Sequence, residues 1–167
     1  ITLFTFSKIL APGFRVGWVV GHPELLDKLV MAKQTADLCT SPFVQKIIAR
    51  YIEKDLLEKN LRKTIDLYRV RRTRMISCLK KYMPDGVVWT EPQGGLFLFV
   101  TLPVHIDADI IFKKALEKNV AFVAGSSFYC NNCGHNTMRL NFSFSNNEEI
   151  DAGIQRLSHV ISDEMIG

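Results

Sequence analysis

The segment from about Asp55 to Tyr82 is the feature that most constrains the fold of this chain. Its apolar residues recur at spacings of three, four or seven, which places them along one side of a single long amphipathic helix. Pro84-Asp85-Gly86 follows directly and ends the helix. The helix therefore separates a front part of the chain from a back part. The apolar stripe consists of Leu57, Leu61, Ile65, Tyr68, Met75, Leu79 and Tyr82.

The front part predicts two neighbouring strands followed by two helices. Ile1–Phe6 and Arg15–Gly21 are rich in strand-forming residues, and the loop between them is broken by Pro12-Gly13, so we expect a hairpin-like pair. A first helix is predicted to open at His22-Pro23 and to run to about Leu38, because proline is well tolerated in a first helical turn. A second helix is predicted to begin at Ser41-Pro42.

The back part alternates strands and helices. Asp107 is a predicted N-cap, and Asn146 with Glu149 three residues later resembles a capping box. This pattern predicts a small α+β domain in which helices cover a sheet, and an α/β class for the chain as a whole. The predicted elements are strands at Val87–Thr90, Leu96–Thr101, Val120–Ala124 and Met138–Ser145, and helices at Ala108–Lys118 and after Asn146.

The composition is typical of one broad class of protein and excludes others. The 167 residues are 47% apolar and 23% charged, which is ordinary for a soluble globular domain, and the net charge of +4 is mild. No apolar run approaches the roughly 20 residues that cross a bilayer, so we expect no membrane partner. The four cysteines are too sparse for a disulfide framework, which favours reduced thiols and a cytoplasmic location.

A group of polar side chains surrounds the first predicted turn. Thr5 and Ser7 supply hydroxyls, Lys8 supplies an amine that can attack a carbonyl, and Arg15 is returned by the Pro12-Gly13 turn. An arginine fork and hydroxyls suit a phosphate, so the group suits a phosphorylated aldehyde. The alternative is a surface loop with incidental basic residues, and composition alone favours that alternative.

Arg139 is the second candidate. Its strand alternates the apolar Met138, Leu140, Phe142 and Phe144 with polar residues, so Arg139 is predicted to lie on the face opposite the core. From that face an arginine can bind a carboxylate through two parallel hydrogen bonds. The alternative is a solvated strand arginine.

Four blocks of the sequence resemble one known family in the correct order. The stretch "TFSKILAPGFRVGWVVG" resembles the lysine signature of fold-type I aminotransferases, which use pyridoxal 5'-phosphate. The others resemble the C-terminal parts of the subgroup that contains α-aminoadipate and kynurenine aminotransferases and their regulator-fused relatives. They are "EPQGGLFLFVTLP", "NVAFVAGSSFY" and "NTMRLNFSFSNNEEIDAGIQRL".

The resemblance implies a role for each candidate residue. Lys8 would be the Schiff-base lysine and would move a proton between the substrate α-carbon and the cofactor. Thr5, Ser7 and Arg15 would hold the cofactor phosphate, although position 5 is more often serine in the family. Arg139 would bind the substrate α-carboxylate, so the substrates would be an amino acid and a 2-oxo acid.

The resemblance also implies that the chain is a C-terminal fragment. Residues 1–54 would be the end of the large cofactor-binding domain, residues 55–83 a connecting helix, and residues 84–167 the small C-terminal domain. The aspartate, aromatic ring and phosphate turn that complete the family's cofactor site precede the lysine, so we expect the chain alone to be inactive. Family members are usually homodimers. The alternative function is a catalytically silent interaction or effector-binding domain of a regulator-fused relative.

Two other sequence features are compatible with a nucleic-acid partner and with a bound metal, but we predict neither. The basic residues between Lys59 and Lys81 permit nucleic-acid binding, but they flank a core stripe and no groove-reading motif accompanies them. The stretch "CNNCGH" from Cys130 to His135 has a metal-like cysteine spacing but lacks a second ligand pair. We therefore predict no nucleic-acid partner and no metal.

Overall fold

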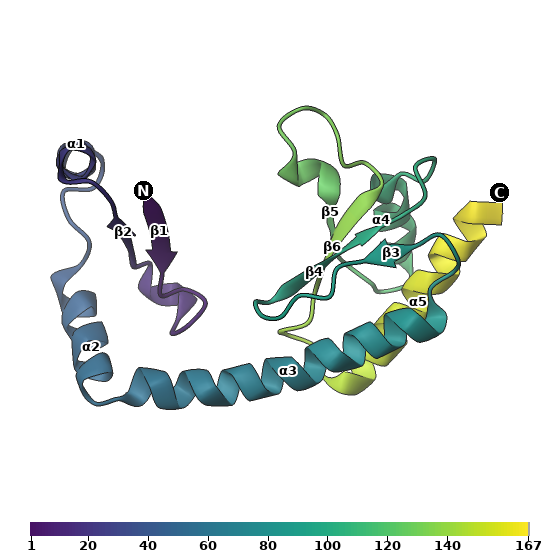
Figure 1. Ribbon diagram of the computed structural model, residues 1–167, viewed down its shortest axis with the longest axis horizontal. Helices are drawn as coiled ribbons and strands as arrows, with labels where there is room; N and C mark the ends of the chain where they lie inside the picture. The colour runs from purple at the N-terminus through teal and green to yellow at the C-terminus, as the bar shows by residue number, and fades with distance from the viewer. Residues whose placement is uncertain (167) are drawn as a thin grey trace. The chain divides into compact units, whose positions relative to one another are not determined.

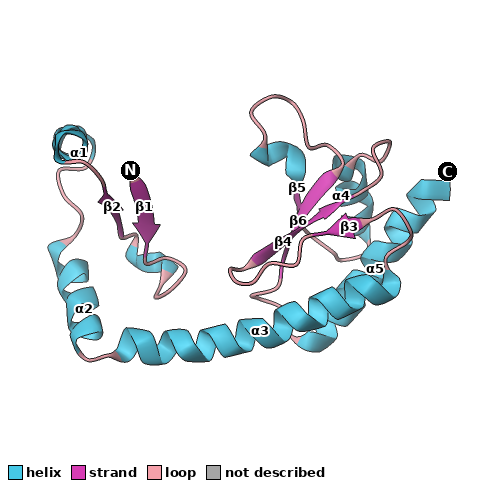
Figure 2. Cartoon of the chain, viewed as in Figure 1, coloured by secondary structure: helices cyan, strands magenta, loops and turns pink. Residues whose placement is uncertain are grey.

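The structure is a computed structural model that describes residues 1–166, and it combines helices with two antiparallel sheets (Figure 2). The chain divides into two compact units, the first being Ile1–Ile65 and the second beginning at Asp66. Among the described residues, no helix combines the length and the apolar character needed to cross a membrane.

The first unit opens with a two-stranded antiparallel sheet. Strand β1 (Thr2–Thr5) pairs with β2 (Gly17–Val20), with Thr2 opposite Val20 and Thr5 opposite Gly17. A short 3-10 helix, η1 (Pro12–Phe14), lies within the connection. The predicted hairpin is confirmed, and it brings the residues that precede the turn back beside those that follow it.

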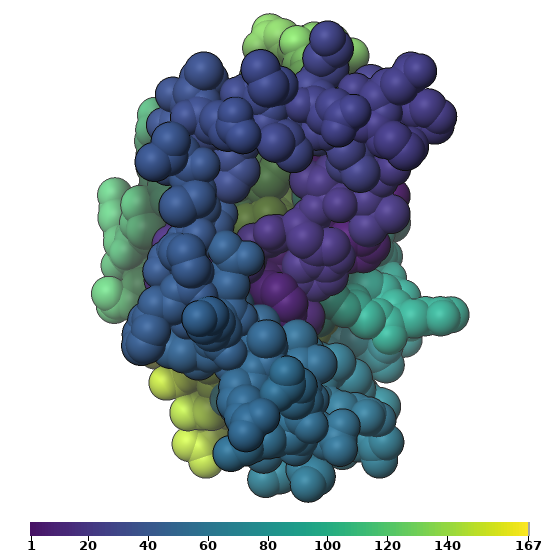
Figure 3. All heavy atoms as spheres, turned by 90° about the vertical axis from the view of Figure 1, so that its left-hand side faces the viewer, coloured from purple at the N-terminus to yellow at the C-terminus, as the bar shows by residue number. Residues whose placement is uncertain are grey.

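Two helices follow the hairpin in the first unit, and both begin at the predicted prolines. Helix α1 (Pro23–Ala36) follows His22, and α2 (Pro42–Glu53) follows Ser41, whose hydroxyl accepts a hydrogen bond from the Val44 amide at 3.5 Å. Figure 3 turns the atoms of α1 and α2 toward the viewer. Several large apolar side chains of this unit are exposed, among them Leu38 and Phe43, at 76% and 73%.

Helix α3 (Leu56–Tyr82) is the predicted long amphipathic helix, and it begins in the first unit and ends in the second. The predicted stripe is buried only toward its end, where Met75 and Leu79 are 5% and 0% exposed. Ile65 is 46% exposed. The periodicity therefore identified the helix correctly, but it overestimated how much of the stripe packs in this chain.

A four-stranded antiparallel sheet forms the centre of the second unit, in the order β3-β4-β6-β5 (Figure 1). The central pair is the longest, with Phe97 opposite Asn141 and Thr101 opposite Thr137. Both edge strands have only two residues. The strands are β3 (Val88–Trp89), β4 (Phe97–Thr101), β5 (Val123–Ala124) and β6 (Thr137–Asn141).

The core of the second unit lies between this sheet and the helices α4 (Ala108–Glu117), α5 (Asn147–Ile166) and the end of α3. Both predicted caps are present. The Asp107 carboxylate accepts from the Asp109 amide at 2.7 Å, and Asn146 accepts from the Glu149 amide at 2.9 Å. The largest fully buried side chains are Phe142, Leu79, Leu98, Leu102, Ile111, Met138, Leu157, Ile161 and Val100.

The last two predicted strands are shorter in the structure. Strand β5 lacks residues 120–122, and β6 ends at Asn141 although the sequence pattern predicted a strand to Ser145. The prediction that Phe144 is a core residue is wrong, since it is 88% exposed. Beyond Asn141 the Phe142 amide still donates to the Leu96 carbonyl at 3.1 Å. The Asn141 side chain then accepts from the Ser143 amide at 2.6 Å, which turns the chain out of the ladder.

Candidate functional site

The predicted phosphate-binding hydroxyls meet at the end of β1. Thr5 and Ser7 lie on the same side of the chain because the Ser7 amide donates to Thr5 Oγ1 at 3.1 Å. The two hydroxyl oxygens are 3.0 Å apart. Thr5 Oγ1 also lies 3.3 Å from the Val16 carbonyl oxygen, which belongs to the returning chain. The hydroxyls therefore form a local pair held by the hairpin.

Lys8 follows this pair directly and lies in the turn. The turn is closed by the Phe6 carbonyl, which accepts from the Leu10 and Ala11 amides at 2.9 and 3.1 Å. Lys8 is exposed, and among residues 1–166 its ammonium group has no ion-pair or hydrogen-bond partner. An exposed and unpaired amine at this position is available to a ligand.

Arg15 returns to the same end of the hairpin. It has a left-handed backbone conformation, with φ 52° and ψ 40°, and it is the first residue after η1. Its Nη1 donates to the Pro12 carbonyl at 3.1 Å, which uses one of the donors of the guanidinium fork. The next residue, Val16, accepts from the Phe6 amide at 3.0 Å, so the register fixes where Arg15 re-enters the sheet.

Arg139 lies in the second unit, on the face of β6 opposite the core, as the alternation of the sequence predicts. Its neighbours along the strand, Met138 and Leu140, are 0% and 5% exposed and point into the core. On the other face, Arg139 is in register with Phe99 of β4 and Val123 of β5. Arg139 therefore lies between apolar side chains of the two neighbouring strands.

Two aromatic rings support the Arg139 guanidinium. Its Cζ atom lies 3.9 Å from the centroid of the Phe97 ring and 4.6 Å from that of Phe128. We call Phe97 and Phe128 the aromatic pair. The Arg139 Nε atom is buried and has no hydrogen-bond partner in the described part of the chain, where Arg139 also forms no ion pair. Buried donors of this kind are rare, and each calls for a physical explanation.

The aromatic pair was not predicted from the sequence. Phe97 is two residues from Phe99 on the same face of β4, so the period of two could have found it. Phe128 comes from a 3-10 helix, η2 (Gly125–Phe128), and no local pattern predicts its contact with Arg139. Thr5, Ser7 and Arg15 gather at one hairpin, whereas Arg139 belongs to the other unit.

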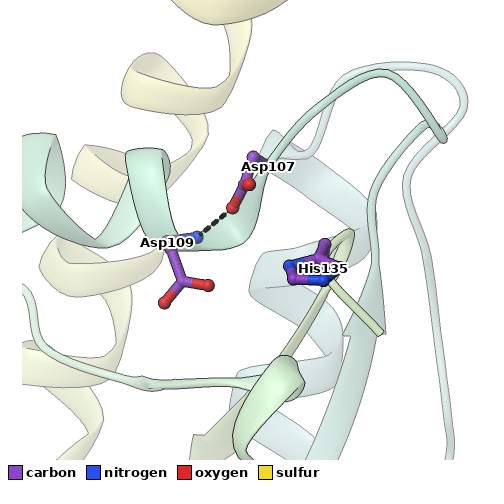
Figure 4. A group of neighbouring side chains, drawn as sticks. All are labelled: Asp107, Asp109 and His135. Carbon is purple, nitrogen blue, oxygen red and sulfur yellow. Dashed lines mark hydrogen bonds between the residues drawn. The ribbon is translucent and has the colours of Figure 1, made fainter. Parts of the chain in front are cut away.

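A cluster of possible metal ligands lies at the start of α4 (Figure 4). Asp107, Asp109 and His135 each offer one ligand atom, and these atoms lie within 4.8 Å of one another. Both carboxylates already have structural partners, since Asp107 caps the helix and Asp109 accepts from the Ser126 hydroxyl at 3.0 Å. The positive end of the helix dipole also opposes a cation there. We therefore assign no metal to this cluster.

The basic residues of α3 are largely engaged within the protein. Arg71 and Arg72 donate to the Ser143 and Pro92 carbonyl oxygens of the second unit. Four others form ion pairs with carboxylates, so the basic stripe is not a free cationic surface. These pairs are Arg62–Glu58, Arg69–Asp66, Arg74–Asp151 and Lys80–Glu91.

Comparison with known proteins identifies the family. Residues 1–157 match the model of aminotransferase class I and II. The chain is 48% identical over 165 residues to aromatic-amino-acid aminotransferase 1 of Thermococcus litoralis, covering 99% of this chain and 40% of that protein. The chain thus spans about 40% of the length of the curated relatives that it matches.

Solved structures agree with this match. The multiple substrate aminotransferase of Thermococcus profundus has a TM-score of 0.94 and 48% identity, over 98% of this chain and 41% of that one. The α-aminoadipate aminotransferase of Thermus thermophilus, complexed with N-(5'-phosphopyridoxyl)-L-leucine, has a TM-score of 0.88 and 38% identity, over 98% and 42%. These likenesses confirm the predicted α/β class, and the chain belongs to the class I and II aminotransferases, a pyridoxal-phosphate-dependent family.

Proposed function

We propose that this chain is the C-terminal part of an aminotransferase that moves an amino group between an amino acid and a 2-oxo acid. The observation that carries the proposal is the end of the β1–β2 hairpin, where a hydroxyl pair, an unpaired lysine and an arginine follow one another. Thr5 and Ser7 are 3.0 Å apart there, directly before Lys8. The family match supplies the reaction class that this group of side chains fits.

The residues of the hairpin fit pyridoxal 5'-phosphate. Two hydroxyls and a guanidinium are suitable donors for a phosphate dianion, and the Thr5 and Ser7 hydroxyls are already oriented toward each other. When bound, the cofactor supplies an aldehyde that attaches to an amine and a ring that accepts electrons from the substrate α-carbon. We propose that Thr5, Ser7 and Arg15 hold the phosphate and that Lys8 Nζ holds the aldehyde carbon.

Lys8 has a second proposed role, in proton transfer. In this role Lys8 Nζ would act on the α-proton of an amino acid substrate. It can remove the α-proton and return it to the cofactor C4' atom, as general base and then general acid. Lysine suits this role because its amine is carried on a flexible stem.

Arg139 is the proposed site for the substrate α-carboxylate. The guanidinium forms no internal ion pair in the described residues, its Nε donor lacks an acceptor, and two aromatic rings lie against it. Two parallel hydrogen bonds to a carboxylate would satisfy this cation in a setting where electrostatic attraction is less screened than in water.

We further propose the domain organisation of the parent protein. Residues 1–54 would end the large cofactor-binding domain, residues 55–83 would connect, and residues 84–167 would form the small domain. The parent would be a cytoplasmic homodimer with no nucleic-acid partner. The chain alone would show no turnover, because it spans about 40% of its relatives. A measurable rate of keto-acid-dependent amino transfer by the 167-residue chain would contradict this last point.

The test is covalent trapping on the chain. The purified chain is titrated with pyridoxal 5'-phosphate, reduced with borohydride and mapped by mass spectrometry, beside the variants Lys8→Arg and Lys33→Arg. Lys33 is a suitable control because it is also solvent-accessible, although it pairs with Asp37 at 2.7 Å. We expect a saturable label on Lys8 that Lys8→Arg abolishes and Lys33→Arg leaves unchanged. Labels scattered over surface lysines would favour the alternative, a catalytically silent interaction or effector-binding domain.

A further inference from the structure

Three aromatic side chains lie together around the Arg139 guanidinium. The guanidinium lies over both rings of the aromatic pair, at 3.9 Å from Phe97 and 4.6 Å from Phe128. Phe128 in turn packs edge-on against Phe99, with ring centroids 5.6 Å apart. The rings therefore form a connected apolar surface beneath and beside the charged group.

Phe97 reaches Arg139 through the register of the sheet. Arg139 is directly opposite Phe99, and Phe97 is opposite Asn141, so Phe97 is the diagonal neighbour of Arg139 on the same face. Side chains at diagonal positions of an antiparallel pair are within reach when they are long or aromatic. This contact is fixed by the central strands of the sheet.

Phe128 reaches Arg139 by a different route, which requires a precisely held turn. Gly125 begins η2 and lies so close to Thr137 that a Cβ atom at position 125 would overlap the Thr137 side chain. The Ser126 hydroxyl donates to Asp109 of α4 at 3.0 Å. At the far end, Gly134 has a φ of +77°, and a Cβ atom there would overlap the Tyr129 ring. Three contacts thus hold the turn that presents Phe128.

From these contacts we infer that Phe97 and Phe128 are positioning residues that hold the Arg139 guanidinium ready for a carboxylate. The inference rests on the proposed carboxylate-binding role of Arg139. A long arginine side chain loses rotamer freedom when it binds a ligand, and a side chain that is already held loses less. The rings also keep water from part of the guanidinium while attracting its charge, which neither a leucine nor an alanine would do.

The inference predicts a dependence of carboxylate affinity on the rings themselves. Replacement of either ring by leucine is expected to weaken carboxylate binding roughly threefold to tenfold, because leucine does not attract the guanidinium as an aromatic face does. Phe128→Tyr keeps the ring and should bind within about twofold of the unchanged chain. Phe144→Leu is the matched control, because Phe144 is 88% exposed and lies outside the paired residues of β6.

The experiment is a titration of the 167-residue chain with propionate, followed by ¹⁵N NMR at the Arg139 Nε–Hε group. This group is buried, which slows exchange of its proton with water and makes the signal observable. Arg139→Lys identifies the signal by its loss. Propionate is chosen because its short tail cannot contact the rings as an aromatic substrate would, and propionamide at the same ionic strength tests the need for charge.

The outcomes separate the inference from the function on which it rests. Saturable shifts in the unchanged chain and in Phe144→Leu, with weaker binding in Phe97→Leu and Phe128→Leu and recovery in Phe128→Tyr, support it. If both leucine variants keep their amide spectra and bind propionate as tightly as the unchanged chain, the inference is overturned while the role of Arg139 stands. If propionate leaves the Arg139 signal unmoved in the unchanged chain, the carboxylate role fails and the inference fails with it.

Discussion

Gly125 and Thr137 approach so closely that Thr137 occupies the space that a side chain at position 125 would need. The atoms that a Cβ at position 125 would meet are the Thr137 hydroxyl, Cβ and carbonyl oxygen, the last two at 2.8 Å. Because the carbonyl belongs to the central strand β6, it cannot move aside without disturbing the ladder. The contact therefore fixes where η2 leaves the sheet.

Gly125→Ala is expected to destabilise the chain by about 1–3 kcal/mol, the usual cost of forcing an extra carbon into a packed site. Gly153→Ala is the matched control, since a Cβ there meets nothing within 4 Å and the residue is inside α5. That change should stabilise by about 0.5–1 kcal/mol, because alanine is the better helix former. Urea unfolding of the three chains measures both effects, and equal stabilities would contradict the close packing at Thr137.

Phe142→Ala and Phe144→Ala are expected to differ sharply although the residues are two apart. Phe142 is 1% exposed, so its truncation should cost about 3–5 kcal/mol. Phe144 is 88% exposed, so its truncation should change stability by less than about 0.5 kcal/mol. Thermal and urea unfolding of the two variants test this difference. A large loss in Phe144→Ala would mean that β6 continues to Ser145, as the alternation alone suggests.

Asn146→Ala is expected to remove about 1 kcal/mol from the stability of the chain. The Asn146 side chain accepts from the Glu148 and Glu149 amides, both at 2.9 Å, and the Glu149 carboxylate accepts from the Asn146 amide at 2.9 Å. Asn146→Ser retains an oxygen that can accept and should stay close to the unchanged chain. The difference between the urea midpoints of the two variants measures how much the helix cap contributes to stability.

Cys78 is expected to make stability fall at alkaline pH. Burial raises the pKa of its thiol, and the charges of Arg74 and Lys81 oppose that effect only in part. The thiol also donates to the Asp151 carboxylate at 2.7 Å. The folded thiol keeps its proton longer than the unfolded one, so its contribution is complete below about pH 8.5 and is lost as pH rises through the folded pKa.

Two measurements check this. Unfolding free energy measured from pH 7 to 10 should fall less steeply in Cys78→Ala than in the unchanged chain. A thiol reagent at pH 8 should label the exposed Cys39, Cys130 and Cys133 before Cys78, which is 2% exposed. Labelling of Cys78 at the rate of the other three would show that the thiol is neither buried nor shifted.

Thr5→Val is expected to weaken attachment of pyridoxal 5'-phosphate to Lys8 by about tenfold or more. A hydrogen bond to a charged group contributes about 1.5–3 kcal/mol, and valine keeps the shape of threonine without the hydroxyl. Thr5→Ser is the control because it keeps the hydroxyl. The extent of borohydride-trapped label against cofactor concentration gives the comparison, and equal curves for Thr5→Val and Thr5→Ser would remove Thr5 from the phosphate site.

Much of the fold follows from local signals in the sequence. The helix starts at Pro23, Pro42 and Ala108 were predicted because proline, serine and aspartate act on the first turn itself. The end of β6 was not predicted, because it depends on a residue far along the chain. Strand β4 begins at Phe97, which lies opposite Asn141, and the hydrogen bond from the Phe142 amide to the Leu96 carbonyl at 3.1 Å lies just beyond this last strand pair.

One part of the candidate site also follows from a local pattern in the sequence, and another part does not. The position of Arg139 on the open face follows from alternation, which is a property of the strand alone. Its contact with Phe128 depends on a turn that Gly125 and Gly134 allow, and neither glycine reveals from the sequence which ring it brings to which partner. The roles of Thr5, Ser7, Lys8, Arg15 and Arg139 stay predictions until the experiments above are done.

The four-stranded sheet is bordered on both sides by strands of only two residues, Val88–Trp89 and Val123–Ala124. A sheet edge attracts further strands through its row of free amides and carbonyls, and a short edge offers too few of them to hold a foreign strand. The second unit is therefore poorly suited to seed cross-β aggregates. The paired strands Thr2–Thr5 and Gly17–Val20 are twice as long, and no short edge strand flanks them among the described residues. Aggregation of this chain would therefore start at its N-terminal hairpin.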